Sequence, residues 1–290
     1  MMIKIKPRRK KHNKIIMKGQ IIKIVSNDYT VCYDNKEYVC KARGKLRSNQ
    51  TIPKVGDYCI FSSEEKIIEK ILPRKNELDR PSVSNIDEAF IVTSLKNPEF
   101  STNLLDKLLV ICEINKIKPI ICLTKKDLLS KNEWKELKKI IKYYKSLNYT
   151  VLYNTNLRKI KKRFKNKTIV FTGQTGAGKS SLINKLDKNL NFETNEISKA
   201  LGRGKHTTRY VTLVPIAKGK ILDTPGFSAL DLTKYKKEDI REAFIEFSKF
   251  NCNYKDCMHI NEKECKVKNK IGKEILKSRY ENYVKFIEKR

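Results

Sequence analysis

The stretch KTIVFTGQTGAGKSS, residues 167–181, decides how this sequence is expected to fold. Residues 167–172 are typical of a buried β-strand, and residues 180–186 are compatible with a helix. Between them lies Gly173-x4-Gly178-Lys179-Ser180, the pattern of a phosphate-binding loop. A strand, a glycine loop and a helix in this order direct backbone N–H groups and a helix N-terminus toward phosphate oxygens. The stretch therefore predicts a nucleotide-binding domain.

This loop offers a group for each part of a bound triphosphate. Gly176 and Gly178 allow the backbone to curl around phosphate oxygens, because glycine adopts positive φ without steric cost. We expect Lys179 to contact the β- and γ-phosphates and the Ser180 hydroxyl to bind Mg²⁺. The full set expected around the phosphates is Gly173, Gln174, Thr175, Gly176, Ala177, Gly178, Lys179, Ser180 and Ser181.

A second motif, Thr124-Lys125-Lys126-Asp127, predicts which base the site prefers. The Asp127 carboxylate can accept hydrogen bonds from both N1–H and the exocyclic amine of guanine. Adenine offers no such donor pair and would leave that charge unpaired, so GTP and GDP are the expected ligands. Lys125 can lay its stem along the base. Thr124 stands where most GTPases have Asn. We therefore expect a weaker side-chain contact from this position to the phosphate loop.

The order of the motifs along the chain is unusual. The base-reading motif comes first, the phosphate loop follows, and Asp223-Thr224-Pro225-Gly226 comes last. In an ordinary GTPase the phosphate loop leads, so the chain looks like a circularly permuted GTPase. The pocket needs only that its loops converge at the carboxyl ends of parallel strands, which chain order does not decide.

Two further segments are expected to sense the γ-phosphate. Asp223 is a candidate Mg²⁺ carboxylate, directly or through water, and the Gly226 N–H can contact the γ-phosphate. Either Thr207 or Thr208 can complete the Mg²⁺ coordination when GTP is bound, and the sequence does not choose between them.

The group that orients the attacking water is a separate question. Phe227 follows the DxxG motif at the position where Ras-like enzymes have a water-orienting Gln, and a phenyl ring cannot do this. Our hypothesis is that His206 is the catalytic residue that orients the water once a partner orders its loop. The alternative is a solvated surface histidine.

A compact set of soft ligands lies near the C-terminus. Cys252-x4-Cys257-x-His259-x5-Cys265 places three thiols and an imidazole within 14 residues. This donor set suits tetrahedral zinc in a closed, structural site, and the alternative is reduced, packed cysteines. The other cysteines lie singly in apolar runs and are expected to be small buried hydrophobes: Cys32, Cys40, Cys59, Cys112 and Cys122.

The pattern outside these motifs predicts a multidomain α/β protein. Five short strand-like runs between residues 18 and 71 suit a small OB-fold barrel, in which Tyr29, Tyr33, Tyr38 and Tyr58 either stack on bases or simply pack. Strands and helices then alternate, as in a parallel sheet with helices on both faces. We expect a basic tail at 1–14, an OB-fold at 15–75, a permuted GTPase domain at 76–235 and a helical zinc-binding domain at 236–290.

Several boundaries follow from the apolar periodicity. Helices are expected at 101–115, 132–147, 237–250 and 268–289, and residues 72–82 read as a polar linker.

The composition points to a polyanionic partner. The chain carries 64 basic against 32 acidic residues, a net charge of +32. A lysine-biased genome explains part of this excess, but it does not by itself explain a twofold ratio of basic to acidic residues. Nucleic acid fits this charge better than a membrane surface, because the sequence has no amphipathic helix with a large apolar face. The sequence has no apolar run of about 20 residues and no signal peptide, so a cytoplasmic location is expected.

Taken together, the permuted motif order, the segment GRGKHTT at 202–208 and the Cys/His cluster resemble the ribosome small subunit-dependent GTPase A family of bacteria. The resemblance extends from about Gly19 to the final helix. It implies an OB-fold, a permuted GTPase domain and a zinc domain, with GTP contacts at 124–127 and 173–181 and one structural Zn²⁺. It also implies late maturation of the 30S subunit, contact with 16S rRNA and subunit-stimulated GTP hydrolysis. We expect a monomer, although the sequence does not determine the oligomeric state. One departure is Tyr153-Asn154-Thr155, where a Ser-Ala loop normally frames the base.

Two other classes of function remain open at this point. A basic RNA-binding protein with a purely structural nucleotide site would bind GTP without turnover. A phosphate-loop ATPase or kinase would prefer ATP, against which Asp127 argues.

Overall fold

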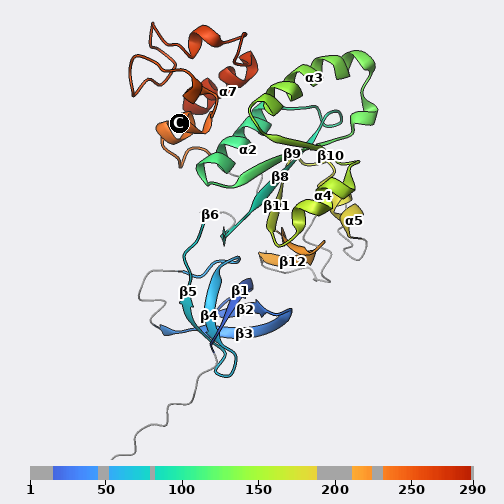
Figure 1. The fold of residues 1–290 in the computed structure, drawn as a ribbon, viewed down its shortest axis with the longest axis vertical. Coiled ribbons are helices and arrows are strands. Elements are labelled where there is room, and N and C mark those ends of the chain that lie inside the picture. The colour runs from blue at the N-terminus through green and yellow to red at the C-terminus, as the bar shows by residue number, and fades with distance from the viewer. Residues whose placement is uncertain (1–15, 45–51, 79–81, 188–210, 224–230, 289–290) are drawn as a thin grey trace, which may run out of the picture. The chain divides into compact units, whose positions relative to one another are not determined.

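The computed structural model describes residues 16–44, 52–78, 82–187, 211–223 and 231–288 (Figure 1). It divides into two compact units, Met1–Arg74 and Lys75–Arg290, and each is described by itself. No helix in these described ranges combines the length and the apolar character needed to cross a membrane.

The first unit is a five-stranded barrel. Its strands follow the order β1-β2-β3-β5-β4, and β4 also pairs with β1 to close the sheet. All pairs are antiparallel except β3 with β5. The strands are β1 Ile16–Val25, β2 Asp28–Tyr33, β3 Lys36–Ala42, β4 Tyr58–Ser62 and β5 Ile67–Ile71. The architecture confirms the predicted OB-like barrel.

Alternating residues fill the interior of this barrel. Its core contains Ile21, Val31, Cys59, Phe61 and Ile68, each with no exposed surface. The predicted tyrosines divide between packing and exposure. Tyr29 is buried and Tyr38 packs on Phe61, whereas Tyr33 and Tyr58 keep about two fifths of their surface exposed, 41% and 40%.

The second unit contains a six-stranded sheet in the order β10-β9-β8-β11-β13-β12. The first five strands run parallel, and β12 pairs antiparallel with β13 at the edge. The bounds are β8 Glu88–Ser94, β9 Lys118–Thr124, β10 Thr150–Tyr153, β11 Thr168–Gly173, β12 Thr212–Ile216 and β13 Gly219–Asp223. This is the predicted parallel α/β architecture.

Helices cover both faces of this sheet (Figure 1). Helices α4 and α5 pack on one face, where Phe164 and Leu182 join a core with Phe90, Ile120 and Phe171 of the strands. Helices α2 and α3 lie on the opposite face. The helices are α2 Thr102–Ile114, α3 Lys131–Ser146, α4 Leu157–Phe164 and α5 Lys179–Leu186, with a short 3₁₀ turn η1 at Lys126–Leu128.

Several elements differ from the sequence expectations in the middle of the chain. Helix α4 and strand β12 were not expected. The stretch 72–82, expected as a linker, includes β6 Glu77–Leu78, which pairs with β7 Val83–Ser84. The strands are too short to give a clear apolar period, so tertiary packing decides them. Helix α4 does have apolar residues at helical spacing, Leu157, Ile160 and Phe164, and was missed in spite of this signal.

The two C-terminal helices are shorter than expected. Instead of 237–250, the chain forms α6 Lys237–Ala243 and a 3₁₀ turn, η3 Phe247–Lys249. Instead of 268–289, it forms a 3₁₀ turn, η4 Lys268–Lys270, and α7 Lys277–Glu288. Gly272 has φ 77°, which ends a right-handed helix at that point. The bend after Ala243 turns Phe244 and Phe247 together onto Tyr283.

A buried charge network fastens this C-terminal region to α2. Arg279 of α7 has no exposed surface and lies between Asp106 of α2 and Glu246, at 2.7 and 2.5 Å. Asp106 also accepts hydrogen bonds from Tyr144 at 2.6 Å and Asn282 at 2.7 Å. Buried charges persist only when they are paired and fully hydrogen-bonded, so these groups fix the position of α7 on α2.

Replacing Arg279 with Met should lower the free energy of unfolding by about 3–5 kcal/mol, because two buried carboxylates lose their counter-charge. Urea denaturation of the purified variant measures this change. Lys277→Ala on the same helix is the control, since the Lys277 side chain is 78% exposed and should change stability by less than about 0.5 kcal/mol. A loss below 1 kcal/mol for Arg279→Met would show that the network does not hold the helix.

Candidate functional site

The sheet topology brings the base-reading motif and the phosphate loop to one edge. Strand β9 ends at Thr124, and β11 ends at Gly173. Strand β8 lies between them, with Ser94 opposite Thr124 and Val92 opposite Gly173. Because these strands are parallel, the loops that follow them leave the sheet on the same side. Strand β13 lies beside β11 and ends at Asp223.

The glycine loop has the backbone that its sequence requires. Gly173, Gly176 and Gly178 have φ values of 124°, 77° and 91°. At Gly173 a Cβ atom would lie 2.0 Å from the Val92 carbonyl oxygen, so the close approach of β11 to β8 admits only glycine. Helix α5 begins at Lys179, directly after this loop, and points its N-terminus toward it.

The lysine of the phosphate loop lies over the loop itself. Its Nζ donates to the carbonyl oxygens of Gly173 at 2.9 Å and Gln174 at 2.8 Å. Burial lowers the pKa of Lys179 from its usual value. The ammonium therefore stands among the backbone groups expected to receive a phosphate, where a phosphate oxygen can replace the two carbonyl acceptors.

A single hydrogen bond joins the two motifs directly. The Thr124 side chain is 1% exposed, and its Oγ1 donates to the Ala177 carbonyl oxygen at 2.7 Å. The two residues are 53 positions apart in the chain. Thr124 thus reaches the phosphate loop without the longer amide that most GTPases use here.

The rest of the base-reading motif is shaped by its backbone. Lys125 adopts the left-handed conformation at φ 56°, and its Nζ donates to the Asn97 carbonyl oxygen in the loop between β8 and α2. Residues Lys126–Leu128 then form the turn η1, on which Asp127 is exposed. Asn97 was not identified from the sequence. Its only signal was the Asn97-Pro98 pair directly after a buried strand.

The segment that departs from the family pattern lies next to this motif. Tyr153 ends β10 opposite Leu123, and the Asn154 N–H donates to the Leu123 carbonyl oxygen at 3.0 Å. The departure at 153–155 therefore adjoins the base reader.

Most of the expected γ-phosphate sensors lie outside the described part of the chain. His206, Thr207, Thr208 and Gly226 lie outside the described residues. Of this group, the structure gives only the backbone of Asp223, the last residue of β13.

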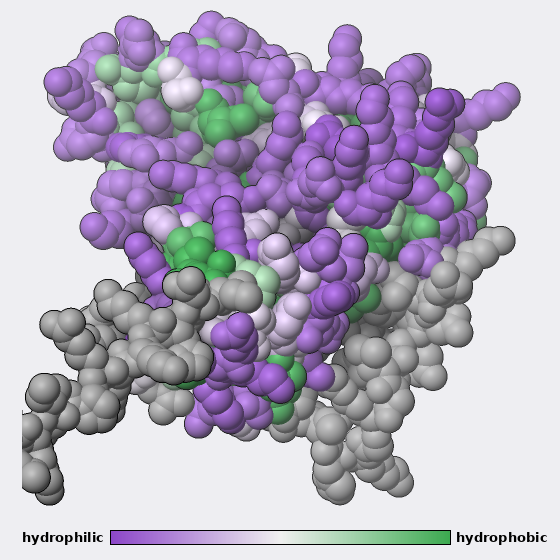
Figure 2. Space-filling view, turned by 60° about the horizontal axis from the view of Figure 1, so that its bottom comes forward, coloured by the Kyte–Doolittle hydropathy of each residue, from purple (hydrophilic) through white to green (hydrophobic). Residues whose placement is uncertain are grey.

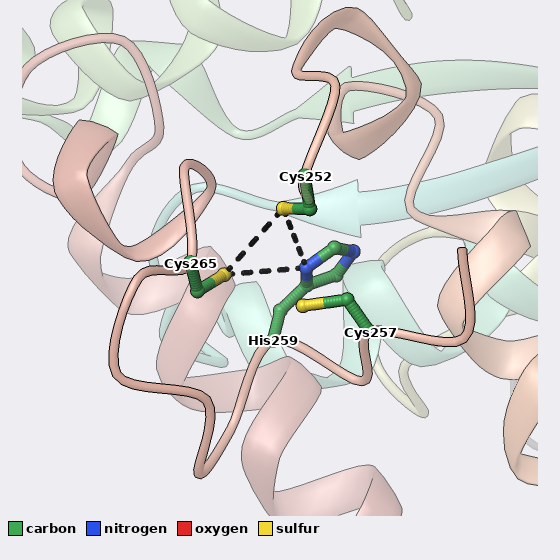
Figure 3. Close-up of side chains that lie close together, drawn as sticks. All are labelled: Cys252, Cys257, His259 and Cys265. Carbon is green, nitrogen blue, oxygen red and sulfur yellow. Dashed lines mark hydrogen bonds between the residues drawn. The ribbon is translucent and has the colours of Figure 1, made fainter. Parts of the chain in front are cut away.

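The four candidate metal ligands converge in space (Figure 3). The ligand atoms of Cys252, Cys257, His259 and Cys265 all lie within 4.8 Å of one another. Cys252 Sγ lies 3.6 Å from His259 Nδ1 and 3.8 Å from Cys265 Sγ, and Nδ1 lies 3.3 Å from Cys265 Sγ.

The three distances among Cys252, His259 and Cys265 are close to the edges of a tetrahedron around a zinc ion, while the 4.8 Å spread of all four ligand atoms is wider. With a Zn–S distance of about 2.3 Å and a Zn–N distance of about 2.0 Å, the edges of a tetrahedron are about 3.8 Å for S···S and about 3.5 Å for S···N. Three thiolates and one imidazole are also a donor set that suits zinc, and they leave no open coordination position. The four residues therefore fit a structural metal ion.

The surrounding residues hold the histidine in place. His259 has φ 59°, and its carbonyl oxygen accepts from the Tyr280 hydroxyl at 2.7 Å. Phe247 packs edge-on against the imidazole with ring centroids 5.2 Å apart. Burial, with a further contribution from the Arg241 charge, lowers the pKa of His259. A neutral imidazole is the form that binds a metal ion.

The remaining cysteines behave as packing groups. Cys40, Cys59, Cys112 and Cys122 are buried, and Cys32 is half-buried. Burial raises the pKa of Cys40 to about 11 and that of Cys122 to about 12, so neither thiol is reactive at neutral pH.

Replacing Thr124 with Val should weaken GDP binding by roughly threefold to tenfold, because the Ala177 carbonyl loses its donor. Isothermal titration calorimetry measures this change. Thr124→Ser keeps the hydroxyl and should bind GDP nearly as tightly as the unaltered chain. Equal affinities for the Val and Ser variants would contradict a role for this hydrogen bond.

Replacing Cys257 with Ser should reduce bound zinc from one ion per chain to nearly none, because a thiolate ligand is lost. Mass spectrometric metal analysis of the purified protein measures the content. Cys32→Ser in the barrel is the matched control and should retain the metal. Full zinc content in Cys257→Ser would exclude this residue as a ligand.

Comparison with known proteins places these features in one family. Residues 71–233 match the RsgA GTPase family, and residues 18–67 match the RsgA N-terminal domain. The small ribosomal subunit biogenesis GTPase RsgA of Pediococcus pentosaceus is 44% identical over 283 residues, covering 93% of this chain and 92% of that protein. The protein of the same name from Bacillus velezensis is 43% identical over 284 residues, covering 93% and 96%.

Two solved structures share the whole architecture. YloQ, described as a circularly permuted GTPase, is 34% identical, covers 98% of this chain and 97% of its own, and has a TM-score of 0.81. YjeQ from Thermotoga maritima is 30% identical, covers 95% and 98%, and has a TM-score of 0.82. The chain therefore belongs to the RsgA family of circularly permuted GTPases.

Proposed function

We propose that this GTPase binds the 30S ribosomal subunit, contacts 16S rRNA and assists late maturation of the subunit. It hydrolyses GTP to GDP and phosphate, with turnover that the subunit stimulates. The observation that carries the nucleotide part is the hydrogen bond from Thr124 to Ala177, which joins a base reader to a phosphate loop. The partner is supported by relatives named small ribosomal subunit biogenesis GTPases, which match over nearly the whole chain.

In this proposal each motif has one task. Asp127 accepts hydrogen bonds from guanine, and the loop at 173–181 surrounds the phosphates with backbone N–H groups. Lys179 neutralises the β- and γ-phosphates. Ser180, together with Asp223 and one of Thr207 and Thr208, holds Mg²⁺, which supplies charge neutralisation when bound. The Gly226 N–H contacts the γ-phosphate.

Water activation falls to a residue outside the usual position. Phe227 has no hydrogen-bonding group, so it cannot orient water. We assign this role to His206, which follows a Gly-Arg-Gly-Lys segment and becomes positioned when the subunit orders that segment. Stimulation by the partner follows, because the catalytic geometry is incomplete without it.

The charge of the chain supports a nucleic-acid partner. The net charge is +32, and the face drawn in Figure 2 is covered mainly by hydrophilic residues. Lysine and arginine contacts to phosphates release counterions, so binding should weaken steeply with salt. A cytoplasmic monomer is the form in which we propose that the protein meets the subunit.

The proposed domains divide these tasks. Residues 15–75 form the RNA-binding barrel, residues 76–235 the GTPase domain and residues 236–290 the zinc-binding domain, after a basic tail at 1–14. A structural Zn²⁺ on Cys252, Cys257, His259 and Cys265 holds the last of these together.

Purified 30S subunits should raise the GTP hydrolysis rate of this protein by at least tenfold and leave ATP hydrolysis at background. Phosphate release with and without subunits measures both rates. His206→Ala should keep GDP affinity and lose the stimulation, while Lys179→Ala should lose activity throughout. An equal GTP hydrolysis rate with and without 30S subunits would contradict the proposed partner. If the subunits stimulate His206→Ala as strongly as the unaltered protein, His206 is excluded as the water-orienting group.

A further inference from the structure

An aromatic pair encloses one lysine of the base-reading motif. The Lys126 Nζ lies 4.2 Å from the centroid of the Trp134 ring and 5.5 Å from that of Tyr153. The two rings are 6.4 Å apart and meet edge to face at 66°. Both distances to the cation are within the range of about 6 Å in which a ring face attracts an ammonium. We call Trp134 and Tyr153 the aromatic clamp.

The clamp comes from two rigid elements. Trp134 lies in the first turn of α3, where Ser130 and Glu133 form a capping box. Tyr153 ends β10, paired in register with Leu123 of β9. Both rings are half-buried. Their positions are therefore set by secondary structure, and the flexible lysine is the part that they restrain.

A second contact fixes the start of α3. Lys96, in the loop after β8, donates to both carboxylate oxygens of Glu133 at 2.9 and 3.1 Å. Hydrogen bonds from Lys96 and Ser130 lower the pKa of Glu133 to about 2, so the pair stays ionised at neutral pH. Trp134 follows Glu133 directly and is held near the base-reading motif by this pair.

The restraint on Lys126 acts on Asp127 through the backbone. Lys126 and Asp127 are the first two residues of the turn η1, and the Lys126 carbonyl oxygen accepts from Leu129 N–H at 3.2 Å. Thr124 and Lys125 are anchored to Ala177 and Asn97 on the other side. The contact of Lys126 with the two rings is thus the anchor on the α3 side, and its loss leaves the turn that carries Asp127 less restrained.

We propose that the aromatic clamp positions Asp127 for guanine, so that Trp134 and Tyr153 are specificity-determining positioning residues. This inference rests on the proposed assignment of Asp127 as the guanine reader. A pre-ordered carboxylate forms both guanine hydrogen bonds without first losing conformational freedom. Hypoxanthine offers only N1–H to the carboxylate, so its binding affinity gains less from the pre-ordered Asp127 side chain. The clamp therefore favours guanine over hypoxanthine and leaves the phosphate chemistry unchanged.

Calorimetric titration of the full-length protein with GDP and with IDP tests this proposal. Trp134→Leu should weaken GDP binding by roughly fivefold and IDP binding by less, so that the ratio of the two affinities narrows. The turnover number at saturating GTP should stay within about twofold. Trp134→Phe keeps a ring face and should retain most of the ratio of GDP to IDP affinity that the unaltered protein has.

Lys126→Met provides an independent variant at an exposed position, where folding is not at risk. It keeps the aliphatic stem and removes the charge from both rings, so it should narrow the ratio of GDP to IDP affinity at least as much as Trp134→Leu does. The double variant should be no worse than Lys126→Met alone, because that variant already removes the contact which Trp134→Leu removes. Additive losses, or equal weakening of GDP and IDP in either variant, would overturn the proposal.

Asp127→Ala separates this inference from the proposed function. If Asp127→Ala abolishes the preference for GDP while Lys126→Met and Trp134→Leu retain it, the guanine reader stands and the clamp is excluded. If Asp127→Ala leaves the preference intact, the base-reading role fails, and the clamp proposal falls with it.

Discussion

The hydrogen bond from Thr124 Oγ1 to the Ala177 carbonyl oxygen is the interaction on which the nucleotide site depends. It connects loops that follow β9 and β11, with β8 between the two strands in the sheet. Parallel strands bring these loops to one edge whatever their order in the sequence. Permutation is therefore tolerated because the pocket is defined by the sheet edge and by this contact between neighbouring loops.

The same edge is connected to the C-terminal region through α2. Arg279 joins Asp106 of α2 to Glu246, with all three side chains buried. The loop that precedes α2 contains Asn97, whose carbonyl oxygen accepts from Lys125 of the base-reading motif. Helix α2 thus carries a partner of the buried network at Asp106, and the loop before it contacts the proposed base-reading motif.

The sequence was most informative where short-range chemistry determines structure. The phosphate loop, the strand and helix on either side of it and the Cys/His cluster were evident because glycine conformation, apolar runs and metal ligands leave clear patterns. Helix ends near Gly272 and Phe244 were placed wrongly, since long-range packing and a single backbone angle end those helices. Asn97 and the aromatic clamp were not seen for a related reason: their roles come from residues brought together by the sheet, not by spacing in the chain.

The central claim is that the motif at 124–127 and the loop at 173–181 form one pocket for a guanine nucleotide. Calorimetric titration of the purified chain with GDP and with ADP tests it most directly. The account predicts saturable GDP binding at one site per chain and no measurable binding of ADP at the same concentrations. ADP binding as tight as GDP binding, or no binding of GDP by folded protein, would contradict it.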